Sequence, residues 1–284
     1  KNSPYKATKH LSKQERKELR LPPDRYYEQM WELTINPATG RTEPEAVEKL
    51  RKQLERESRS KRAPGDDVNN PWVSIGPNNV GGRTRAVLFD PNDPDYKRVF
   101  SGGVSGGLWV NDDITSEDSE WRMVQGVPGN LNVTTIAVDP TDSNNWYLGK
   151  GEQFKQGVVI GNGVYKSTDG GMSWQGLNLM PADLEGDLVG TSIEFLSGVF
   201  YINDVIVWEN KSENRTEIFV TVGSEIDADT NKITVLGHQS TGLYKSIDQG
   251  ITWNRVETDI FKYSGLFGTE TFLTPNDLEI GADN

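Results

Sequence analysis

Residues 242–253, Gly-Leu-Tyr-Lys-Ser-Ile-Asp-Gln-Gly-Ile-Thr-Trp, repeat the pattern of residues 163–174, Gly-Val-Tyr-Lys-Ser-Thr-Asp-Gly-Gly-Met-Ser-Trp. The shared unit is Gly-aliphatic-Tyr-Lys-Ser-x-Asp-x-Gly-x-(Ser/Thr)-Trp. Alternating aliphatic and aromatic side chains, followed by a Ser-x-Asp-x-Gly turn, predict two short strands joined by a tight hairpin. The sequence therefore contains the same β-hairpin at least twice.

The residue types in these hairpins indicate a structural role. A turn aspartate accepts hydrogen bonds from backbone N–H groups nearby, and a glycine takes the positive φ angle that other residues resist. A tryptophan at the start of the return strand buries a large aromatic face. We predict this role for Ser167, Asp169, Gly171 and Trp174 in the first hairpin and for Ser246, Asp248, Gly250 and Trp253 in the second.

A third, degenerate copy of the unit lies earlier in the chain. Residues 107–113, Gly-Leu-Trp-Val-Asn-Asp-Asp, place Asn111 and Asp113 at the serine and aspartate positions. Trp121 follows three residues later than the spacing of the other copies predicts. The unit therefore recurs three times along the chain.

This pattern resembles the Asp-box, or BNR repeat, of sialidases, xyloglucanases and sortilin-type proteins. There the motif forms the hairpin between the last two strands of a propeller blade. The resemblance implies an all-β propeller fold and implies nothing about activity, because the box usually lies away from the ligand-binding face. Function has to be sought elsewhere on the chain.

Composition limits the function classes. The chain has 284 residues, no cysteine, two histidines and a net charge of −12. Without cysteine, disulfides, thiol catalysis and thiolate metal sites are excluded, and two histidines argue against a zinc site or a Ser-His-Asp triad. The sequence contains no apolar run long enough to cross a membrane.

Net charge and the pattern of predicted secondary structure divide the chain into two regions. Residues 1–64 carry 16 Lys and Arg against 10 Asp and Glu, whereas residues 65–284 carry 14 against 32. An acidic body argues against nucleic acid as its partner. We predict a basic, partly helical arm and linker over residues 1–70, with a helix from Lys13 to Leu21 and two more opening near Asp24 and Thr42. A propeller region over residues 71–284 follows.

Short β-rich runs in the second region form about three blades. The parallel turns at residues 89–93 and 138–142 support the period independently of the hairpins. Insertions at residues 153–162, 181–203 and 224–239 are expected to emerge as loops on one face. Residues 276–284 look like the first strand and turn of a fourth blade. Because three blades and a fraction do not close a ring, we expect the chain to be part of a longer protein.

A second resemblance covers nearly the whole chain. Residues 22–30, 72–86 and 101–109, above all Gly-Pro-Asn-Asn-Val-Gly-Gly-Arg-Thr-Arg at residues 76–85, look like the amino-terminal part of secreted Bacteroidota proteins with sortilin-like Asp-boxes. Those proteins usually end in a type IX secretion sorting domain. The resemblance implies export to the cell surface or medium, and secretion-translocon or outer-membrane surface proteins as partners.

Few residues carry a signature of chemistry. Arg83 and Arg85 alternate on one predicted strand and are the candidate ligand-facing pair, although the Arg-Ile-Pro signature of sialidases is absent. Asp227, Asp229 and Asn231 occupy the first three ligand positions of a calcium loop but lack its Gly and Glu, so they form a weak calcium candidate. No catalytic residue and no cofactor is predicted.

The leading prediction is a secreted or cell-surface propeller module that binds a protein or glycan partner and is not itself an enzyme. One alternative is a glycoside hydrolase of the sialidase or xyloglucanase type. Its two carboxylates cannot be chosen by spacing among 42 acidic residues. The other alternative is a structural component of an outer-membrane secretion or gliding assembly.

Overall fold

The computed structural model of the chain describes part of the sequence. The described ranges are residues 10–19, 82–128, 131–153, 159–179, 186–189, 193–196, 198–229, 232–257, 262–264 and 270–281, with the single positions 8, 33, 35, 36, 38, 50, 53 and 56. The chain divides into two compact units, Lys1–Val73 and Ser74–Asn284.

Helix α1 (Lys13–Glu18) is the described helix of the first unit. The predicted capping box is present, because the Ser12 hydroxyl accepts from the N–H of Glu15 while the Glu15 carboxylate accepts from the N–H of Ser12. The helix is shorter than predicted, with Leu19 as its C-cap. The second and third predicted helices lie almost entirely outside the described residues.

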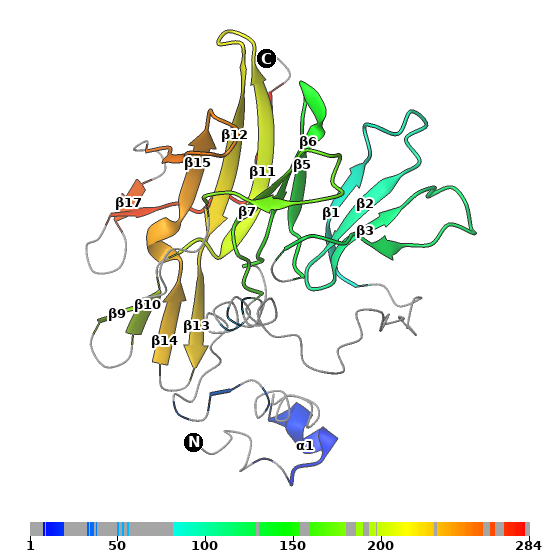
Figure 1. Cartoon of the computed structure of the whole chain (residues 1–284). Helices are drawn as coiled ribbons and strands as arrows, with labels where there is room; N and C mark the ends of the chain where they lie inside the picture. The colour runs from blue at the N-terminus through cyan, green and yellow to red at the C-terminus, as the bar shows by residue number, and fades with distance from the viewer. Residues whose placement is uncertain are drawn as a thin grey trace. The chain divides into compact units, whose positions relative to one another are not determined.

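The second unit is built on three antiparallel sheets of four strands, each in simple up-and-down order (Figure 1). The first sheet consists of β1 (Thr84–Phe89), β2 (Val99–Gly103), β3 (Gly107–Asn111) and β4 (Arg122–Met123). The second sheet consists of β5 (Thr135–Asp139), β6 (Asp142–Gly149), β7 (Val164–Ser167) and β8 (Gln175–Gly176). The third sheet consists of β11 (Tyr201–Asn210), β12 (Arg215–Gly223), β15 (Gly242–Ser246) and β16 (Asn254–Arg255).

The first strands of the three sheets lie side by side. Strand β5 contacts β1 on one side and β11 on the other, and the remaining strands of each sheet lead away from them (Figure 1). Successive four-stranded sheets with neighbouring first strands are blades of a propeller. The structure is therefore all-β and corresponds to about three blades of an incomplete propeller, as the sequence predicted.

The blades pack face to face, and strand β6 shows how. Trp146 and Leu148 on β6 belong to the apolar core shared with the first sheet, whereas Tyr147 belongs to the core shared with the third. Successive residues of β6 thus face opposite cores, as expected of a strand that is buried on both faces. Trp146 is completely buried, and its ring meets that of Phe100 on β2 edge-on, with centroids 4.8 Å apart.

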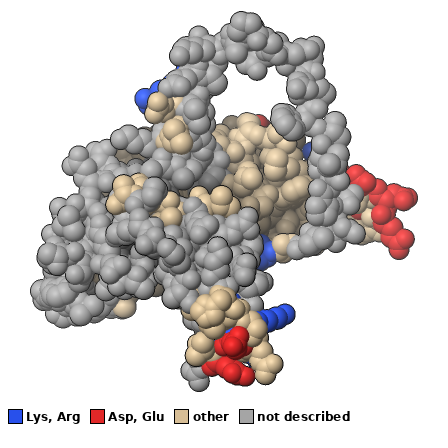
Figure 2. Space-filling model, turned by 90° about the horizontal axis from the view of Figure 1, so that it is seen from below, with Lys and Arg blue, Asp and Glu red and all other residues tan. Residues whose placement is uncertain are grey.

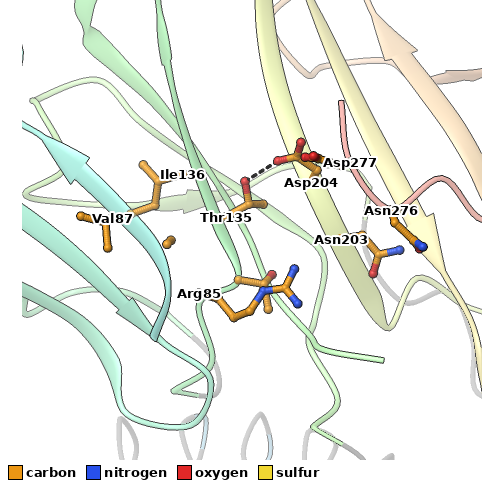
Figure 3. A pocket seen from close by; sticks show the side chains of 10 residues that line it. Arg85, Val87, Thr135, Ile136, Asn203, Asp204, Asn276 and Asp277 are labelled. Atoms are coloured by element: carbon orange, nitrogen blue, oxygen red, sulfur yellow. Dashed lines mark hydrogen bonds between the residues drawn. The ribbon is translucent and has the colours of Figure 1, made fainter. Parts of the chain in front are cut away.

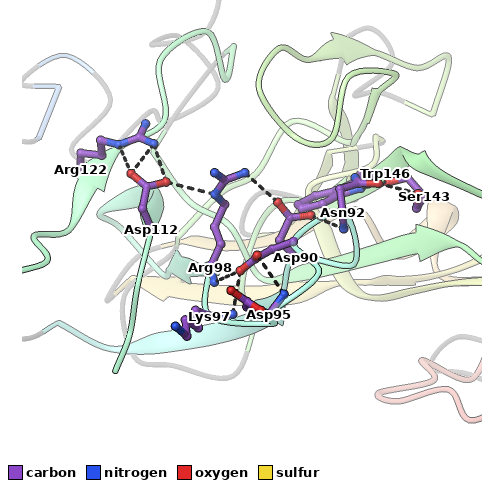
Figure 4. A network of polar contacts seen from close by, with 10 residues as sticks. Asp90, Asn92, Asp95, Lys97, Arg98, Asp112, Arg122, Ser143 and Trp146 are labelled. Atoms are coloured by element: carbon purple, nitrogen blue, oxygen red, sulfur yellow. Dashed lines mark hydrogen bonds and ion pairs between the residues drawn. The ribbon is translucent and has the colours of Figure 1, made fainter. Parts of the chain in front are cut away.

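Polar contacts between turns also join the first two sheets (Figure 4). The Asn92 amide donates to the carbonyl of Ser143 and accepts from the Ser143 hydroxyl. The same Ser143 carbonyl accepts from the indole N–H of Trp146. Arg98 forms ion pairs with Asp90 and Asp112 beside these turns. The two parallel turns recognised in the sequence therefore lie in contact.

Two of the three predicted loops do not remain loops. Residues from the insertion at 181–203 form β9 (Gly186–Val189) and β10 (Ile193–Leu196), and residues from that at 224–239 form β13 (Glu225–Asp229) and β14 (Lys232–Leu236). They join in one sheet of order β13-β14-β10-β9, in which β10 and β14 run parallel. Prediction missed this sheet because its two hairpins pair with each other only after the blades have brought them together. A short 3₁₀ helix, η2 (His238–Ser240), leads from it back to the third sheet.

The predicted fourth blade is not formed in the described residues. After β17 (Lys262–Ser264) and β18 (Glu270–Phe272), residues 273–281 contain no strand, although a strand was expected from residue 276. This segment is instead held by side chains of the second and third sheets, which are described with the cleft below.

Candidate functional site

The two hairpin repeats form the same hydrogen-bond network. In each, the buried serine hydroxyl donates to the aspartate and accepts from the glycine N–H, at 2.7 and 2.9 Å for Ser167 and 2.8 Å for both bonds of Ser246. Each aspartate also accepts from the backbone N–H and hydroxyl of the Ser or Thr four residues later. Both tryptophan indoles donate to the glycine carbonyl. These residues are engaged within their own turns.

The glycines of the repeats are required both by their backbone angle and by the space around them. Gly171 and Gly250 have φ angles of 82° and 87°, in the left-handed region that favours glycine. A Cβ atom on Gly171 would lie 2.7 Å from the Trp146 ring, and one on Gly250 would lie 2.5 Å from Leu177. Each turn therefore packs closely against the neighbouring core.

The degenerate copy differs from the other two. Asn111 replaces the serine and accepts from the N–H of Asp113 and from the Ser119 hydroxyl, and Asp113 accepts from Thr115 rather than from a residue four positions on. Trp121 is 41% exposed, whereas Trp174 is 7% exposed. The displaced tryptophan thus lies outside the core, although the turn keeps its own side-chain hydrogen bonds.

Replacing Ser167 by alanine is expected to lower the free energy of unfolding by about 1–3 kcal/mol, because the buried N–H of Gly171 loses its acceptor. Ser173→Ala is the matched control, since it removes an exposed hydroxyl that donates to Asp169 in the same turn. Chemical denaturation of the two variants measures the difference. An equal decrease in the free energy of unfolding for both variants would contradict our view that the buried N–H of Gly171 causes most of the loss.

The aspartates of the repeats are ionised well below neutral pH. Hydrogen bonds from the Thr252 hydroxyl and N–H, and from the Ser246 hydroxyl, lower the pKa of Asp248 to about 2. A carboxylate that is already fully bonded and ionised is poorly suited to proton transfer at neutral pH. In both repeats the aspartate accepts its hydrogen bonds from residues of its own turn.

A cleft of about 450 Å³ lies at the other end of the blades. In the second sheet, Ser167 pairs in register with Trp146, whereas the cleft residue Thr135 pairs with Gly149 at the opposite end of the strands. Residues from the first strands of all three sheets line the cleft, together with two from the segment at 273–281 (Figure 3): Arg85, Ala86, Val87, Thr134, Thr135, Ile136, Asn203, Asp204, Asn276 and Asp277.

The insertions leave the blades at the cleft end. They connect β6 to β7, β8 to β11 and β12 to β15, whose junctions lie on the side of Gly149 and Gly223. The sheet of β9, β10, β13 and β14 therefore rises on the same side as the cleft. Long connections gathered at one end of a rigid scaffold are typical of a binding face.

Asp204 joins three elements around the cleft. Its carboxyl group accepts from the Thr135 hydroxyl at 2.8 Å, from the N–H of Val205 at 2.8 Å and from the N–H of Leu278 at 3.0 Å. Burial raises the pKa of Asp204, and the charge of Asp277 adds to this rise, while the hydrogen bonds oppose it. Asp204 therefore holds a proton more readily than an exposed aspartate does.

The segment at 273–281 presents a second carboxyl group to the cleft. The Asn203 amide donates to the carbonyl of Pro275, and that of Gln153 donates to Asn276. Asp277 is exposed and forms no hydrogen bond with another described residue. One protonatable and one solvent-exposed carboxyl group thus line one cleft.

Of the predicted arginine pair, Arg85 lies on β1 at the same cleft, and Arg83 immediately precedes that strand. Arg83 and Arg85 both donate to one oxygen of Glu152, and the distance is 3.1 Å from Arg85 Nη1. Glu152 is 1% exposed, and the side chain of Arg85 is 27% exposed. Arg85 lines the cleft, whereas Arg83 is not among the lining residues.

The calcium candidate lies outside what the structure describes. Asp227 and Asp229 fall on β13, whose side chains from residue 226 onward are not described, and neither is Asn231. Among the described residues, no three His, Cys, Asp or Glu side chains gather closely enough to hold a metal ion.

Two further properties of the described residues are the hydropathy of their helices and the distribution of basic side chains. No helix in the described ranges is long and apolar enough to span a membrane. On the face seen in Figure 2, Lys and Arg occur only in small, separate groups among the described residues. These residues form no broad basic patch on that face.

Sequence reasoning did not single out Asp204, Asp277 or Glu152. A signal was present for the aspartates, because Asn203-Asp204-Val205 recurs as Asn276-Asp277-Leu278. For Glu152 there was none, since its arginine partners precede it by 69 and 67 residues.

The fold and the cleft define an all-β protein built of propeller blades. A polar cleft lies between the first strands of these blades, at the end opposite the hairpin repeats. No family model matches the sequence. The chain is 26% identical over 190 residues to the xyloglucanase Xgh74A of Acetivibrio thermocellus, which covers 60% of this chain and 19% of that enzyme. The GH74 xyloglucanase of Xanthomonas campestris aligns with 67% of this chain and 24% of its own, at 20% identity and a TM-score of 0.36. The chain spans about a fifth of the xyloglucanases it matches in sequence.

Proposed function

We propose that this chain belongs to a carbohydrate-active propeller of the glycoside-hydrolase type, and that the cleft binds the glycan. The observation that carries the proposal is the pair Asp204 and Asp277 in one cleft, one with a raised pKa and one exposed. The distant similarity to xyloglucanases supports a polysaccharide as the ligand. The position of the cleft, at the end from which the insertions emerge, supports a ligand-binding face.

The chemistry follows from the two environments. Glycoside hydrolysis needs a carboxylic acid that protonates the leaving oxygen and a carboxylate that activates water or attacks the sugar. Asp204, whose pKa is raised by burial and by Asp277, supplies the acid. Asp277, exposed in the same cleft, supplies the carboxylate.

A second candidate is a module that binds its partner without cleaving it. Three donors already engage the two oxygens of Asp204, which suits a group that fixes Leu278 and Thr135 in place. In this form the cleft binds a glycan or a protein segment, and Asp204 shapes it. The catalytic candidate has the closer support in the similarity to xyloglucanases.

Full-length protein incubated with a polysaccharide panel that includes xyloglucan distinguishes the two. Hydrolysis is expected to release reducing ends, and Asp277→Asn is expected to lower the rate at least about hundredfold. Asp118→Asn, an exposed carboxylate outside the cleft, is the matched control. Binding without release of reducing ends would reject the catalytic candidate and retain the binding module.

The acid role of Asp204 also predicts a pH dependence. Because the acid must be protonated, the rate is expected to fall as pH rises through the folded-state pKa of Asp204, which lies above the ordinary aspartate value. Asp204→Asn is expected to remove this alkaline limb. An unchanged limb in that variant would assign the acid to another residue.

We further propose that the protein is secreted or held at the cell surface by a type IX pathway, with residues 1–70 as an arm outside the propeller region of residues 71–284. Support comes from the sequence resemblance at residues 76–85 and from the basic charge of the arm. Pull-down from outer membranes with and without residues 1–70 tests the arm as a docking element for secretion or gliding components. Recovery of the same proteins in both cases would reject a docking role of the arm.

A further inference from the structure

Arg83 and Arg85, at the start of the first sheet, are bonded to a residue of the connection from β6 to β7. Glu152 follows β6 and is almost completely buried, and one of its oxygens accepts from Arg83 and Arg85. A buried carboxylate without a cationic partner is strongly destabilising. Each arginine is therefore positioned by Glu152, which lies in the connection from β6 to β7.

The backbone around Glu152 leaves that place little freedom. Gly151, with a φ angle of 98°, turns the chain, and its N–H donates to the buried Asn132 side chain. Glu152 itself pairs with Val159, its N–H donating to the Val159 carbonyl at 3.0 Å. A side chain fixed by its own backbone and by burial orients the groups bonded to it.

The two arginines differ in what they face. Arg85 lines the cleft and Arg83 does not, although both bind the same oxygen of Glu152. Figure 3 shows the Arg85 side chain extending from the first sheet into the cleft, with Asp204 and Asp277 together on the side of the third sheet. The cleft thus has a cationic wall and a carboxyl wall.

We propose that Arg85, held in place by Glu152, forms an anion subsite, and that the cleft takes a saccharide carrying a carboxylate, as uronic acids do. This inference rests on the proposed glycan-binding function. The planar guanidinium matches the geometry of a carboxylate, and its charge strengthens each hydrogen bond. One sugar ring places its carboxylate at Arg85 and its hydroxyl donors toward Asp277. Glu152 acts as a positioning residue.

The acidic charge of residues 65–284 does not oppose this assignment at contact. Charges farther than about 8 Å from the ligand are largely screened at physiological ionic strength. Arg85 acts at hydrogen-bond distance inside a cleft, where screening is weaker. The local guanidinium therefore determines the preference for an anionic group.

The test is a titration of full-length protein with oligosaccharides that differ only in charge. An oligogalacturonate is compared with its methyl ester, and a glucuronate-containing oligosaccharide with its own ester, by calorimetry at 0.15 M salt. At least one free acid is expected to bind about tenfold more tightly than its ester, the factor of one charge-assisted hydrogen bond. Arg85→Gln is expected to abolish this preference, so that acid and ester bind equally.

Arg83→Gln is the matched control, because it removes the other partner of the same carboxylate outside the cleft and is expected to keep the acid preference. Glu152→Gln is expected to reduce the preference without removing it. Thermal melting verifies that each variant is folded, and Arg85→Lys serves as a second variant if Arg85→Gln is not.

Three results would overturn the inference. They are equal binding of acid and ester, a preference that persists in folded Arg85→Gln and Arg85→Lys, and binding of neutral glycans only. Each of these leaves glycan binding intact, whereas failure to bind any glycan rejects the proposed function together with the inference.

Discussion

Replacing Trp146 by alanine is expected to lower the free energy of unfolding by about 3–5 kcal/mol. The side chain is completely buried between the first and second sheets and meets Phe100 edge-on. Its indole N–H donates to the carbonyl of Ser143, and Gly171 packs directly on its ring. Truncation leaves a cavity between two blades and removes the hydrogen bond from Trp146 to Ser143 at the start of β6.

Trp121→Ala is the matched control for this change. Trp121 is 41% exposed and lies outside the core clusters, so its loss is expected to cost less than about 1 kcal/mol. Urea denaturation with a shared m-value compares the two variants. Similar midpoints for both would show that the interface between the first two blades contributes far less than its burial indicates.

The second large effect is expected at Gly151. Its φ angle is 98°, and a Cβ atom there would lie 2.0 Å from the carbonyl oxygen of Phe200. Alanine at this position meets both a strained backbone and a clash with backbone atoms, which together are expected to cost about 3 kcal/mol or more. Because Gly151 precedes Glu152, the arginine pair is expected to lose its orientation as well.

Gly106→Ala provides the comparison, because the nearest atom to its added Cβ lies 3.8 Å away and its φ angle is not positive. Thermal melting of the two variants gives the stability difference. Oligosaccharide titration of whatever folded Gly151→Ala is obtained shows whether the acid preference is lost with it. Equal melting temperatures would mean that the connection from β6 to β7 shifts freely and does not hold Glu152.

The variants of Trp146 and Gly151 test two different regions of the propeller. Trp146 lies on β6 at the interface of blades, toward the hairpin-repeat end, and Gly151 follows the cleft end of that strand. A loss at Trp146 is expected to lower stability without changing ligand preference, whereas a loss at Gly151 changes both. This contrast distinguishes stability of the blades from organisation of the cleft.

Local sequence determined the hairpins and the capped start of α1. In each, the interacting residues lie within about eight positions, as when Ser167 bonds Asp169 and Gly171, so the chemistry of the turn is complete in the sequence itself.

Only the tertiary structure decided the rest. Two insertions form one sheet because β10 pairs in parallel with β14, which lies 40 residues farther along the chain. The cleft joins Arg85, Asp204 and Asp277, which the sequence separates widely, and Glu152, which binds Arg85, lies in the connection from β6 to β7. Burial and proximity to Asp277 raise the pKa of Asp204, and both exist only when the blades stand side by side. Turn chemistry is local and can be predicted from the sequence, whereas the site depends on which surfaces the packed blades bring together.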